Sequence, residues 1–571
     1  MIIGIDLGTT NSLVAAWLDG KPTLIPNALG EFLTPSCVSI DEDGQVLVGR
    51  AARDRLQTHP ARSASVFKRY MGSGRALDLA GKSYHPEELS ALVLRSLKAD
   101  AEATLGHEIT EAIITVPAYF SDAQRKATRT AGQLAGLKVD RLLNEPTAAA
   151  LAYGLHQAAP ESQFLVFDLG GGTFDVSVLQ MFEGVMEVRA SAGDNMLGGE
   201  DFTQLLVQGY FTHSGVPEAA CDDASFRQRL IARADIAKRE LAGNAPVAIA
   251  LHWRDEEYSW TIDAAQFARS AEALLARLWR PVEGALRDAR IPASELSNVV
   301  LAGGATRMPL VRQQATRMFG RFPESTLDPD QVVALGAAVQ AGLRMKDAAL
   351  DDIVMTDVCP YSMGVEVAQH LPDGSRVTGF YSVVIERNTV VPTSRVGRYH
   401  PTGANQTKID LQIYQGESRL VRDNIKLGSI EVPITRRNGE GGDVDVRFTY
   451  DANGLLEVEV VEIATSARHQ LVITSSNHEL SQDEIAERLK ILSALKIHPR
   501  DTLANRSLLA EAERVFQLLL GANRDRFGQW VGLFEQALIS QDERLITDRA
   551  AQLRRVIAQI EANGFLEPEP V

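Results

Sequence analysis

The spacing of hydrophobic residues changes along the chain and divides it into two parts. Up to about residue 350, short apolar runs alternate with stretches of helical patterning. The apolar runs lie at 112–116, 164–167 and 298–302, and the helical patterns at 121–136, 226–242, 264–289 and 307–319. This alternation is typical of α/β domains. We therefore predict that residues 1–350 form an α/β domain.

Residues 359–478 carry a period of two instead. Apolar and polar side chains alternate over 409–413, 444–450 and 456–460. Strict alternation predicts antiparallel strands with one buried face. This part of the chain is therefore expected to form a β-sandwich.

Two further segments complete the predicted organisation. Residues 351–358 form a short apolar run bracketed by acidic side chains, before Pro360, and we interpret them as an interdomain linker. The alternative is an edge strand of one domain. Beyond the sandwich, Ser481–Glu484 has the sequence of a helix capping box, so residues 479–571 are predicted to form a short helical lid and a tail.

Length and composition agree with a multidomain globular protein. A chain of 571 residues exceeds what one hydrophobic core supports, and 45% hydrophobic with 23% charged residues is an ordinary composition. The formal net charge of −16 argues against broad contact with the nucleic-acid backbone. Nucleic acid is therefore not an expected partner.

Membrane insertion and export are not expected either. No apolar run reaches the ~18 residues of a membrane span, and the N-terminus lacks the basic region of a signal peptide. Cys37, Cys221 and Cys359 are far apart and fit neither a disulfide framework nor a metal motif. A reducing, cytoplasmic compartment is the resulting expectation.

One short motif occurs twice in the α/β part. Gly4–Asn11 and Phe167–Asp175 both contain an Asp-Leu-Gly turn between two apolar runs, and their aspartates, Asp6 and Asp168, are 162 residues apart. Backbone N–H groups of glycine turns can ring an anion, and an adjacent carboxylate can hold the metal of a polyphosphate. The repeat predicts a duplicated half-domain with a ligand between the copies. Two structural hairpins are the alternative.

Other positions carry candidate chemistry of their own. Glu145 begins a predicted helix and could face the same crevice, although the helix dipole alone would stabilise a carboxylate there. Asp235, Lys238 and Arg239 share one helix face and suit an adenosine clamp, with an exposed ion pair as the alternative. Lys68 could place a positive charge at a γ-phosphate, although a Lys-Arg pair is usually a surface feature.

Seven stretches together resemble the 70-kDa heat-shock chaperones, the DnaK-like family. They are Ile3–Ser12, Ile114–Phe120, Asn144–Gly154, Asp168–Asp175, Leu197–Phe202, Gly303–Pro309 and Asp328–Gln340. The similarity covers roughly residues 1–500, and the shortened regions are most like the HscC branch. It implies a multidomain fold: an actin-like (duplicated ribonuclease-H-like) α/β ATPase domain, a linker, an antiparallel β-sandwich that holds an extended peptide, and an α-helical lid.

By motif match, the resemblance implies roles for individual residues. Contacts around the phosphates are expected from Thr9, Thr10, Asn11, Gly170, Gly171, Gly172, Gly198, Gly199 and Glu200. The nucleoside clamp would comprise Asp235, Lys238, Arg239, Gly303, Gly304, Arg307 and Asp330. Hydrolysis would depend on Asp6, Lys68, Glu145, Asp168 and Thr173, with water as the nucleophile. Of these, Asp6, Glu145 and Asp168 would surround Mg²⁺, mainly through water.

The resemblance also implies coupling between domains and a set of partners. The interdomain switch would comprise Pro117, Arg125 and Asp357, and the peptide cleft Ala368, Tyr399 and Ile409. ATP binding would dock the linker and open the lid, and hydrolysis would trap the peptide. The implied cofactors are ATP/ADP and Mg²⁺, with K⁺ left open. The implied partners are unfolded client polypeptides and a J-domain co-chaperone, whose contact positions in the family match Arg141 and Asp357.

Several positions depart from the family pattern. Asp235 and Ala242 stand where Glu and Ser are usual, and the segment from Ala242 to Trp260 is short in the lobe that exchange factors grip. The need for a nucleotide-exchange factor therefore stays open. Thr356 replaces an apolar linker residue, and Ala368 is small for one side of a peptide arch.

Two other classes of protein share the expected nucleotide-binding fold. A sugar or small-molecule kinase needs an aspartate base aimed at a substrate hydroxyl, and an actin-like filament protein needs no peptide-binding domain. Neither class accounts for a period-two domain after a linker. An ATP-dependent, peptide-binding chaperone is therefore the predicted function.

Overall fold

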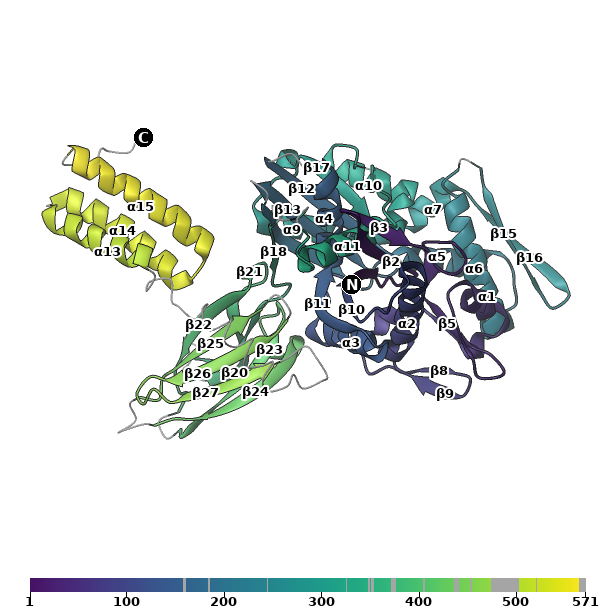
Figure 1. Cartoon of the computed structure of the whole chain (residues 1–571), viewed down its shortest axis with the longest axis horizontal. Helices are drawn as coiled ribbons and strands as arrows, with labels where there is room; N and C mark the ends of the chain where they lie inside the picture. The colour runs from purple at the N-terminus through teal and green to yellow at the C-terminus, as the bar shows by residue number, and fades with distance from the viewer. Residues whose placement is uncertain are drawn as a thin grey trace.

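The computed structural model describes most of the chain (Figure 1). The described residues are 1–157, 161–182, 185–243, 245–324, 326–347, 350, 354–370, 376–403, 406–435, 441–451, 454–473, 503–519 and 521–563. In these residues, sheets flanked by helices form the large N-terminal part, and a β-rich part and a group of helices follow it.

The first large sheet holds the first Asp-Leu-Gly turn. Its strands are ordered β11-β10-β1-β2-β3, and β4 also pairs with β2. Their bounds are Ile2–Asp6 (β1), Asn11–Leu18 (β2), Lys21–Ile25 (β3), Thr34–Pro35 (β4), Glu111–Val116 (β10) and Lys138–Asn144 (β11). β1 is antiparallel to β2 and parallel to β10, so Asp6 and its turn lie at the end of a central strand.

The second large sheet repeats this arrangement. β12 (Glu161–Leu169) is antiparallel to β13 (Phe174–Phe182) and parallel to β17 (Asn298–Ala302), and β14 (Val185–Asp194) pairs with β13. Asp168 therefore lies at the end of β12 as Asp6 lies at the end of β1. The duplication predicted from the repeated motif is visible in the pairing of the strands.

Helices cover both sheets (Figure 1). Their bounds are Arg50–Thr58 (α1), Pro86–Leu105 (α2), Asp122–Leu134 (α3), Glu145–Gln157 (α4), Gly199–His213 (α5), Ala224–Glu240 (α6), Ala264–Ser270 (α7), Glu272–Arg277 (α8), Trp279–Ala289 (α9), Pro309–Phe319 (α10) and Val332–Arg344 (α11). α3 begins at a capping box: Gln124 N donates to Ser121 Oγ at 3.4 Å, and Ser121 N donates to Gln124 Oε1 at 2.9 Å. This helix start is the one that the sequence predicts.

α4 and α11 pack against each other and join the two halves. A Cβ at Gly336 would lie 1.7 Å from the carbonyl oxygen of Ala148, so a glycine is required at this crossing. α11 contacts β1 and β2, whereas α4 contacts β12 and β13. Trp17 from the first sheet and Val166 from the second are buried in the core that these helices share. We call the two sheet-containing halves the first and the second lobe.

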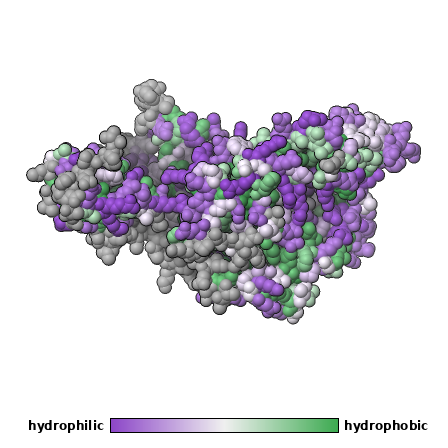
Figure 2. Space-filling model, turned by 90° about the horizontal axis from the view of Figure 1, so that it is seen from above, coloured by the Kyte–Doolittle hydropathy of each residue, from purple (hydrophilic) through white to green (hydrophobic). Residues whose placement is uncertain are grey.

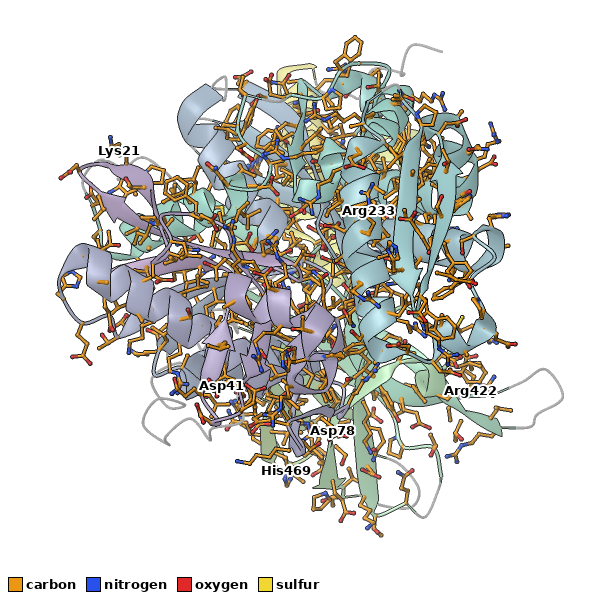
Figure 3. All side chains as sticks on the ribbon, turned by 90° about the vertical axis from the view of Figure 1, so that its right-hand side faces the viewer. Lys21, Asp41, Asp78, Arg233, Arg422 and His469 are labelled. Atoms are coloured by element: carbon orange, nitrogen blue, oxygen red, sulfur yellow. The ribbon has the colours of Figure 1, made fainter. Side chains whose placement is uncertain are left out.

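Smaller sheets lie at the edges of the lobes. The first lobe carries β5 (Cys37–Ile40), β6 (Val46–Val48), β7 (Ser63–Ser65), β8 (Leu77–Leu79) and β9 (Lys82–Tyr84). The second lobe carries a hairpin of β15 (Val247–Trp253) and β16 (Glu256–Ile262), which extends away from the sheet core (Figure 1). Arg233 on α6, labelled in Figure 3, donates to the carbonyl oxygen of Ala248 at 2.7 Å and ties this short hairpin to α6.

The predicted linker contains a strand. β18 (Val354–Val358) lies parallel to β14, with Thr356 opposite Glu187, and antiparallel to β21 (Val390–Val391). The segment therefore extends the second sheet and joins it to the first strands of the β-rich part. Residues 351–353 at its start lie outside the described residues.

The β-rich part contains two four-stranded antiparallel sheets around one core. The first sheet is ordered β20-β19-β23-β24 and the second β22-β25-β26-β27. Their bounds are Met363–His370 (β19), Arg376–Ile385 (β20), Thr393–Tyr399 (β22), Lys408–Gln415 (β23), Ile425–Pro433 (β24), Val444–Tyr450 (β25), Leu456–Glu462 (β26) and Arg468–Ile473 (β27). Ile409, Leu411 and Ile413 are buried between more exposed neighbours, as their alternation predicts.

The C-terminal helices form a bundle beside the sandwich (Figure 1). They are α13 (Leu503–Leu518), α14 (Gly521–Ser540) and α15 (Glu543–Asn563), and their apolar side chains share one core. Between α14 and α15, Gln541 Nε2 donates to the carbonyl oxygen of Val396 in β22 at 3.3 Å, and Arg544 pairs with Glu187 in β14. The predicted capping box at 481–484 lies outside the described residues.

Among the residues that the structure describes, no segment is suited to crossing a bilayer. None of the described helices combines the length and the apolar character of a membrane span. On the face shown in Figure 2, hydrophilic residues are interspersed with hydrophobic ones.

Candidate active site

The two Asp-Leu-Gly turns meet between the lobes. A Cβ at Gly171 would lie 2.0 Å from Thr10 Oγ1, and a Cβ at Gly172 would lie 2.7 Å from Thr9 Oγ1. No other residue type could bring the two backbones so close. Thr9 is buried, whereas Thr10 is exposed, so the first turn lines the junction and reaches its opening.

The start of α5 forms the third wall of this junction. Gly199 N donates to the carbonyl oxygen of Gly170 at 2.9 Å, and Glu200 N donates to that of Gly171 at 2.8 Å. A Cβ at Gly198 would lie 2.5 Å from the backbone of Gly171. Glycine turns beside the start of a long helix supply backbone donors and a positive dipole, which suits a phosphate group.

Buried carboxylates line the same crevice. Burial, followed by the nearby charge of Glu145, raises the pKa of Asp6 to about 7 and that of Asp175 to about 8. The same two causes raise the pKa of Asp168 well above its usual range. A cluster of acids that resist ionisation attracts cations, because a bound cation would restore their charged forms.

Lys68 is the cation that the chain itself places among these acids. Its Nζ lies 2.7 Å from Glu145 Oε1, with the two side chains only 4% and 10% exposed. Lys68 Nζ also lies 5.6 Å from the centre of the Phe120 ring. The alternative of a surface lysine is therefore wrong. Glu145 does begin α4 as predicted, and its partner in the crevice is Lys68.

Two carboxylate oxygens in the crevice have no hydrogen-bond partner. Asp168 Oδ2 and Asp175 Oδ2 are both buried and unsatisfied. Such atoms are costly to leave unpaired, so the site fits a hydrated or directly bound cation. In the described part of the chain, however, no three His, Cys, Asp or Glu side chains group closely enough to hold a metal by themselves. This arrangement favours a metal held largely through water and phosphate oxygens.

Asp175 is a site residue that the sequence reasoning missed. It faces Asp168 directly across the β12–β13 pair, and its Oδ1 accepts from Tyr119 N at 3.1 Å. The signal was present, because Asp175 closes the second Asp-Leu-Gly motif. A carboxylate on the strand that follows the turn would normally be assigned a structural role.

The clamp residues on α6 are brought together as predicted. Asp235 Oδ1 lies 2.9 Å from Lys238 Nζ, and Asp235 also pairs with Arg239. Lys238 in turn donates to the carbonyl oxygen of Gly199 at 3.0 Å and to Thr203 Oγ1 at 2.7 Å. The ion pair offered as the alternative is thus present, and Lys238 also faces the wall formed by α5.

The third glycine turn closes the crevice from the second lobe. Gly303 has a φ of 78°, and a Cβ there would lie 2.3 Å from the carbonyl oxygen of Leu169. A Cβ at Gly304 would lie 2.4 Å from Asp330 Oδ1, and Arg307 Nε donates to Asp330 Oδ2 at 2.6 Å. Gly303, Gly304, Arg307 and Asp330 therefore form one connected group beside the turn that carries Asp168.

A chain of hydrogen bonds runs from the first lobe to the linker strand. Arg125 Nη2 donates to Asn144 Oδ1 at 2.6 Å, and Asn144 Nδ2 donates to both carboxylate oxygens of Asp357 at 3.0 Å. Burial raises the pKa of Asp357. Pro117 accepts from Phe120 N at 3.1 Å in the loop that Arg125 also caps. Asn144 was missed as a site residue because only the pairing of β18 brings Asp357 to it.

The predicted peptide-cleft residues lie in the sandwich, away from the crevice. Ala368 sits at a register shift between β19 and β20. Tyr399 ends β22, with its hydroxyl 3.1 Å from Ser382 Oγ, and Ile409 is 8% exposed in β23. The remaining predicted phosphate residue, Asn11, opens β2 opposite Pro35.

Comparison with protein families decides the assignment. A family model described as Hsp70 protein matches residues 2–78 and 73–564, which is nearly the whole chain. The chain belongs to the Hsp70 family. Hsp70 proteins are ATP-dependent chaperones that bind ATP and ADP with Mg²⁺, hydrolyse ATP, and act on client polypeptides with J-domain co-chaperones. The predicted class of protein, its ATPase activity and its nucleotide cofactor agree with this membership.

The paired lobes are also what membership of the Hsp70 family implies. The family implies an actin-like ATPase domain, a β-sandwich and a helical lid, and the described elements occur in that order along this Hsp70 chain. The kinase and filament alternatives share only the first of these parts.

Proposed function

We propose that this Hsp70 protein couples ATP hydrolysis in the crevice between its lobes to peptide binding in its sandwich. The proposal rests on a continuous path of contacts from the crevice to the linker strand. The two glycine turns lie in the crevice with the unsatisfied carboxylate oxygens of Asp168 and Asp175. Asn144, next to Glu145, bonds to Asp357 of the linker strand. Nucleotide in the crevice and the position of the linker are thereby linked through adjacent residues.

In the crevice, the backbone groups of both turns would hold the phosphates. Thr9, Thr10 and Thr173 add hydroxyl donors. Gly198 and Gly199 would bring the start of α5, with its positive dipole, beside the phosphates. Asp6, Glu145 and Asp168 would hold Mg²⁺ mainly through its water shell. Bound there, the ion would neutralise developing charge on the phosphoryl oxygens.

The attacking water would be positioned by the chain's own groups. Lys68 stands at the inner end of the crevice with its charge fixed by Glu145, and Thr173 follows the three glycines of the second turn. A preorganised cation beside the transferred group stabilises charge that develops in the transition state. Phosphoryl transfer to water needs positioning and charge more than covalent participation.

Asp175 would bind a second cation, for which K⁺ is the candidate.

The adenosine would lie between α6 and the third glycine turn. Asp235, Lys238 and Arg239 come from one side, and Gly303, Gly304, Arg307 and Asp330 come from the other. Arg239 pairs with Asp235 but is 68% exposed, so the flat face of its guanidinium could still cover a base. Asp235, which is shorter than the glutamate usual in the family, holds Lys238 and Arg239 close to α6.

Nucleotide state would reach the sandwich through β18. Residues 351–358 are proposed as the linker between an ATPase domain over 1–350 and a sandwich over 359–478, with 479–571 as a short lid. The strand pairing of β18 with β14 corresponds to a docked linker. Release of β18 would slow the exchange of an extended apolar peptide held near Ala368, Tyr399 and Ile409.

Partners are proposed from the same junction. Arg141 lies in β11, and burial lowers its pKa while the charge of Asp357 counteracts that effect. A J-domain partner contacting Arg141 and Asp357 would act directly on the docked linker. The β15–β16 hairpin is short. This supports membership of the HscC branch and a weak dependence of nucleotide release on exchange factors that grip this lobe.

Steady-state and single-turnover ATP hydrolysis by the full-length protein test the proposal. Hydrolysis should be accelerated by apolar peptides and by a J-domain protein, with phosphate released to water. Transfer of the γ-phosphate to a small hydroxyl compound would instead support the kinase alternative. ATP-dependent light scattering without peptide binding would support a filament protein.

A further inference from the structure

A second cavity lies outside the nucleotide crevice, where the second lobe meets the sandwich. Its volume is about 630 Å³, within the range of small-molecule sites. One wall is α8 and α9, and another is the end of β14. The third wall comes from the sandwich, which contributes Arg387 and Glu417. The cavity is therefore complete only while the sandwich is docked against the lobe.

Three arginines form a stripe on the helical wall. Arg277, Arg280 and Arg287 follow one another at steps of three and seven residues, and Leu278 between α8 and α9 keeps helical φ and ψ angles. These steps place all three on one helix face. A Cβ at Gly284, one turn before Arg287, would meet nothing within 4 Å, so the helix surface is open between Arg280 and Arg287.

Each carboxylate of the cavity is already paired with an arginine. Asp194 accepts from Arg277 Nη2 at 2.7 Å. Asp288 and Glu417 each accept from Arg387 at 2.8 Å, and these contacts raise the pKa of that guanidinium. Two of the four arginines therefore hold all three acids in ion pairs, and the arginines of the lining outnumber its acids by one.

The two arginines of the cavity outside these hydrogen-bonded pairs are Arg280 and Arg287. Within the described residues, Arg280 lines the cavity without an ion pair or hydrogen bond. Arg287 is 70% exposed and reaches Asp288 only at 3.5 Å. Their Cα atoms are about 10 Å apart along the helix, since seven residues rise by ~1.5 Å each. Two guanidinium forks at this spacing suit two separate anionic groups.

We propose that this interdomain cavity binds a small molecule carrying two phosphate-like groups, one at Arg280 and one at Arg287. Ala192 and Pro281 have small side chains and Gly193 has none, which leaves room for the body of the ligand. The site is separate from the nucleotide crevice and does not require that the chain hydrolyse ATP. Because the sandwich completes the cavity, a bound ligand would also favour the docked position of β18.

Calorimetric titration of the full-length protein with fructose 1,6-bisphosphate tests the site, with ionic strength held constant. The crevice is saturated by a non-hydrolysable ATP analogue and Mg²⁺, because ATP is proposed to keep the linker docked. We expect binding at least tenfold tighter than that of fructose 6-phosphate, and no binding of fructose. The double variant Arg280→Gln/Arg287→Gln should bind the bisphosphate at least tenfold more weakly. The matched control Arg95→Gln/Arg422→Gln removes two exposed arginines elsewhere and should bind normally; Arg422 is labelled in Figure 3.

Each other result overturns the proposal. Absence of bisphosphate binding, equal weakening in both double variants, or competition between the bisphosphate and the ATP analogue would remove this cavity as the site. Hydrogen exchange supplies an independent readout: the bisphosphate should slow exchange of the amides in 354–358 in the wild type and not in the Arg280/Arg287 variant. Unchanged exchange would refute the effect on docking. ATP hydrolysis is not measured in these experiments, so their failure leaves the proposed ATPase function untouched.

Discussion

Asn144 Nδ2 lies 3.0 Å from both carboxylate oxygens of Asp357, joining the residue before Glu145 to the strand that leads into the sandwich. This contact crosses from the first lobe to β18, the strand in the predicted linker. It connects the crevice between the lobes directly to β18.

Asn144→Ala should uncouple the two domains. The variant leaves the buried Asp357 carboxylate without its side-chain donor, which favours release of β18 by a factor of roughly 10–100 if a hydrogen bond to a charged group contributes ~1.5–3 kcal/mol. Basal single-turnover hydrolysis should persist, while its stimulation by apolar peptide is lost. Full peptide stimulation in Asn144→Ala would show that coupling runs elsewhere.

Thr173→Ala should slow hydrolysis without preventing nucleotide binding. Thr173 is buried at the end of the second glycine turn, where its hydroxyl would meet the transferred phosphoryl group. Loss of one preorganised donor slows chemistry on the order of 10²-fold. Single-turnover hydrolysis and ATP affinity measure the two effects separately. Thr212→Ala, on the exposed side of α5, should match the wild type, and equal rates in both variants would remove Thr173 from the site.

Lys68→Met should destabilise the protein as well as inactivate it. The change leaves Glu145 buried among Asp6, Asp168 and Asp175 without its cation. Breaking a buried ion pair costs about 3–5 kcal/mol. Urea unfolding of the nucleotide-free protein measures this loss. Lys82→Met, in an exposed strand, should leave the unfolding free energy unchanged, and equal stability of the two variants would contradict the role assigned to Lys68.

Asp175→Asn should flatten the dependence of stability on pH. Burial raises the pKa of Asp175 to about 8 in the folded protein, above its value of 3.8 in a model peptide. The folded state therefore binds the proton more tightly, and this contribution to stability is full below pH 4 and is lost as pH rises towards 8. Relative to the wild type, the isosteric asparagine should be more stabilising at pH 8 than at pH 5. If the difference in unfolding free energy between the variant and the wild type is the same at pH 5 and at pH 8, Asp175 does not titrate in this range.

Ile409→Trp should weaken peptide binding at an unchanged basal rate of hydrolysis. Ile409 is 8% exposed in β23, so a larger side chain must enlarge its surroundings or enter the proposed cleft. Affinity for a fluorescent apolar peptide should fall at least tenfold. Ile425→Trp makes the same change at an exposed edge position of β24 and serves as the control. Intact peptide affinity in Ile409→Trp would place the cleft elsewhere.

Local structure followed from local patterns. The alternation at 409–413 predicts β23, and Ser121 with Gln124 predicts the start of α3, because side-chain period and capping depend only on near neighbours. The repeated Asp-Leu-Gly motif likewise predicted two related halves. Glycine at 171 and 172 signals a close backbone approach, although the sequence does not say to what.

The sequence alone thus determined the elements, their order, the paired turns and the family resemblance. Only the tertiary structure decided which distant residues meet: Lys68 with Glu145, Asn144 with Asp357, and Arg387 with the acids beside α9. Burial and ion pairing arise from packing between segments that the chain separates by tens to hundreds of residues. For that reason a Lys-Arg pair of the kind usually found at the surface contains a cation buried in the crevice, Lys68. For the same reason a stripe of arginines lines a cavity between the second lobe and the sandwich.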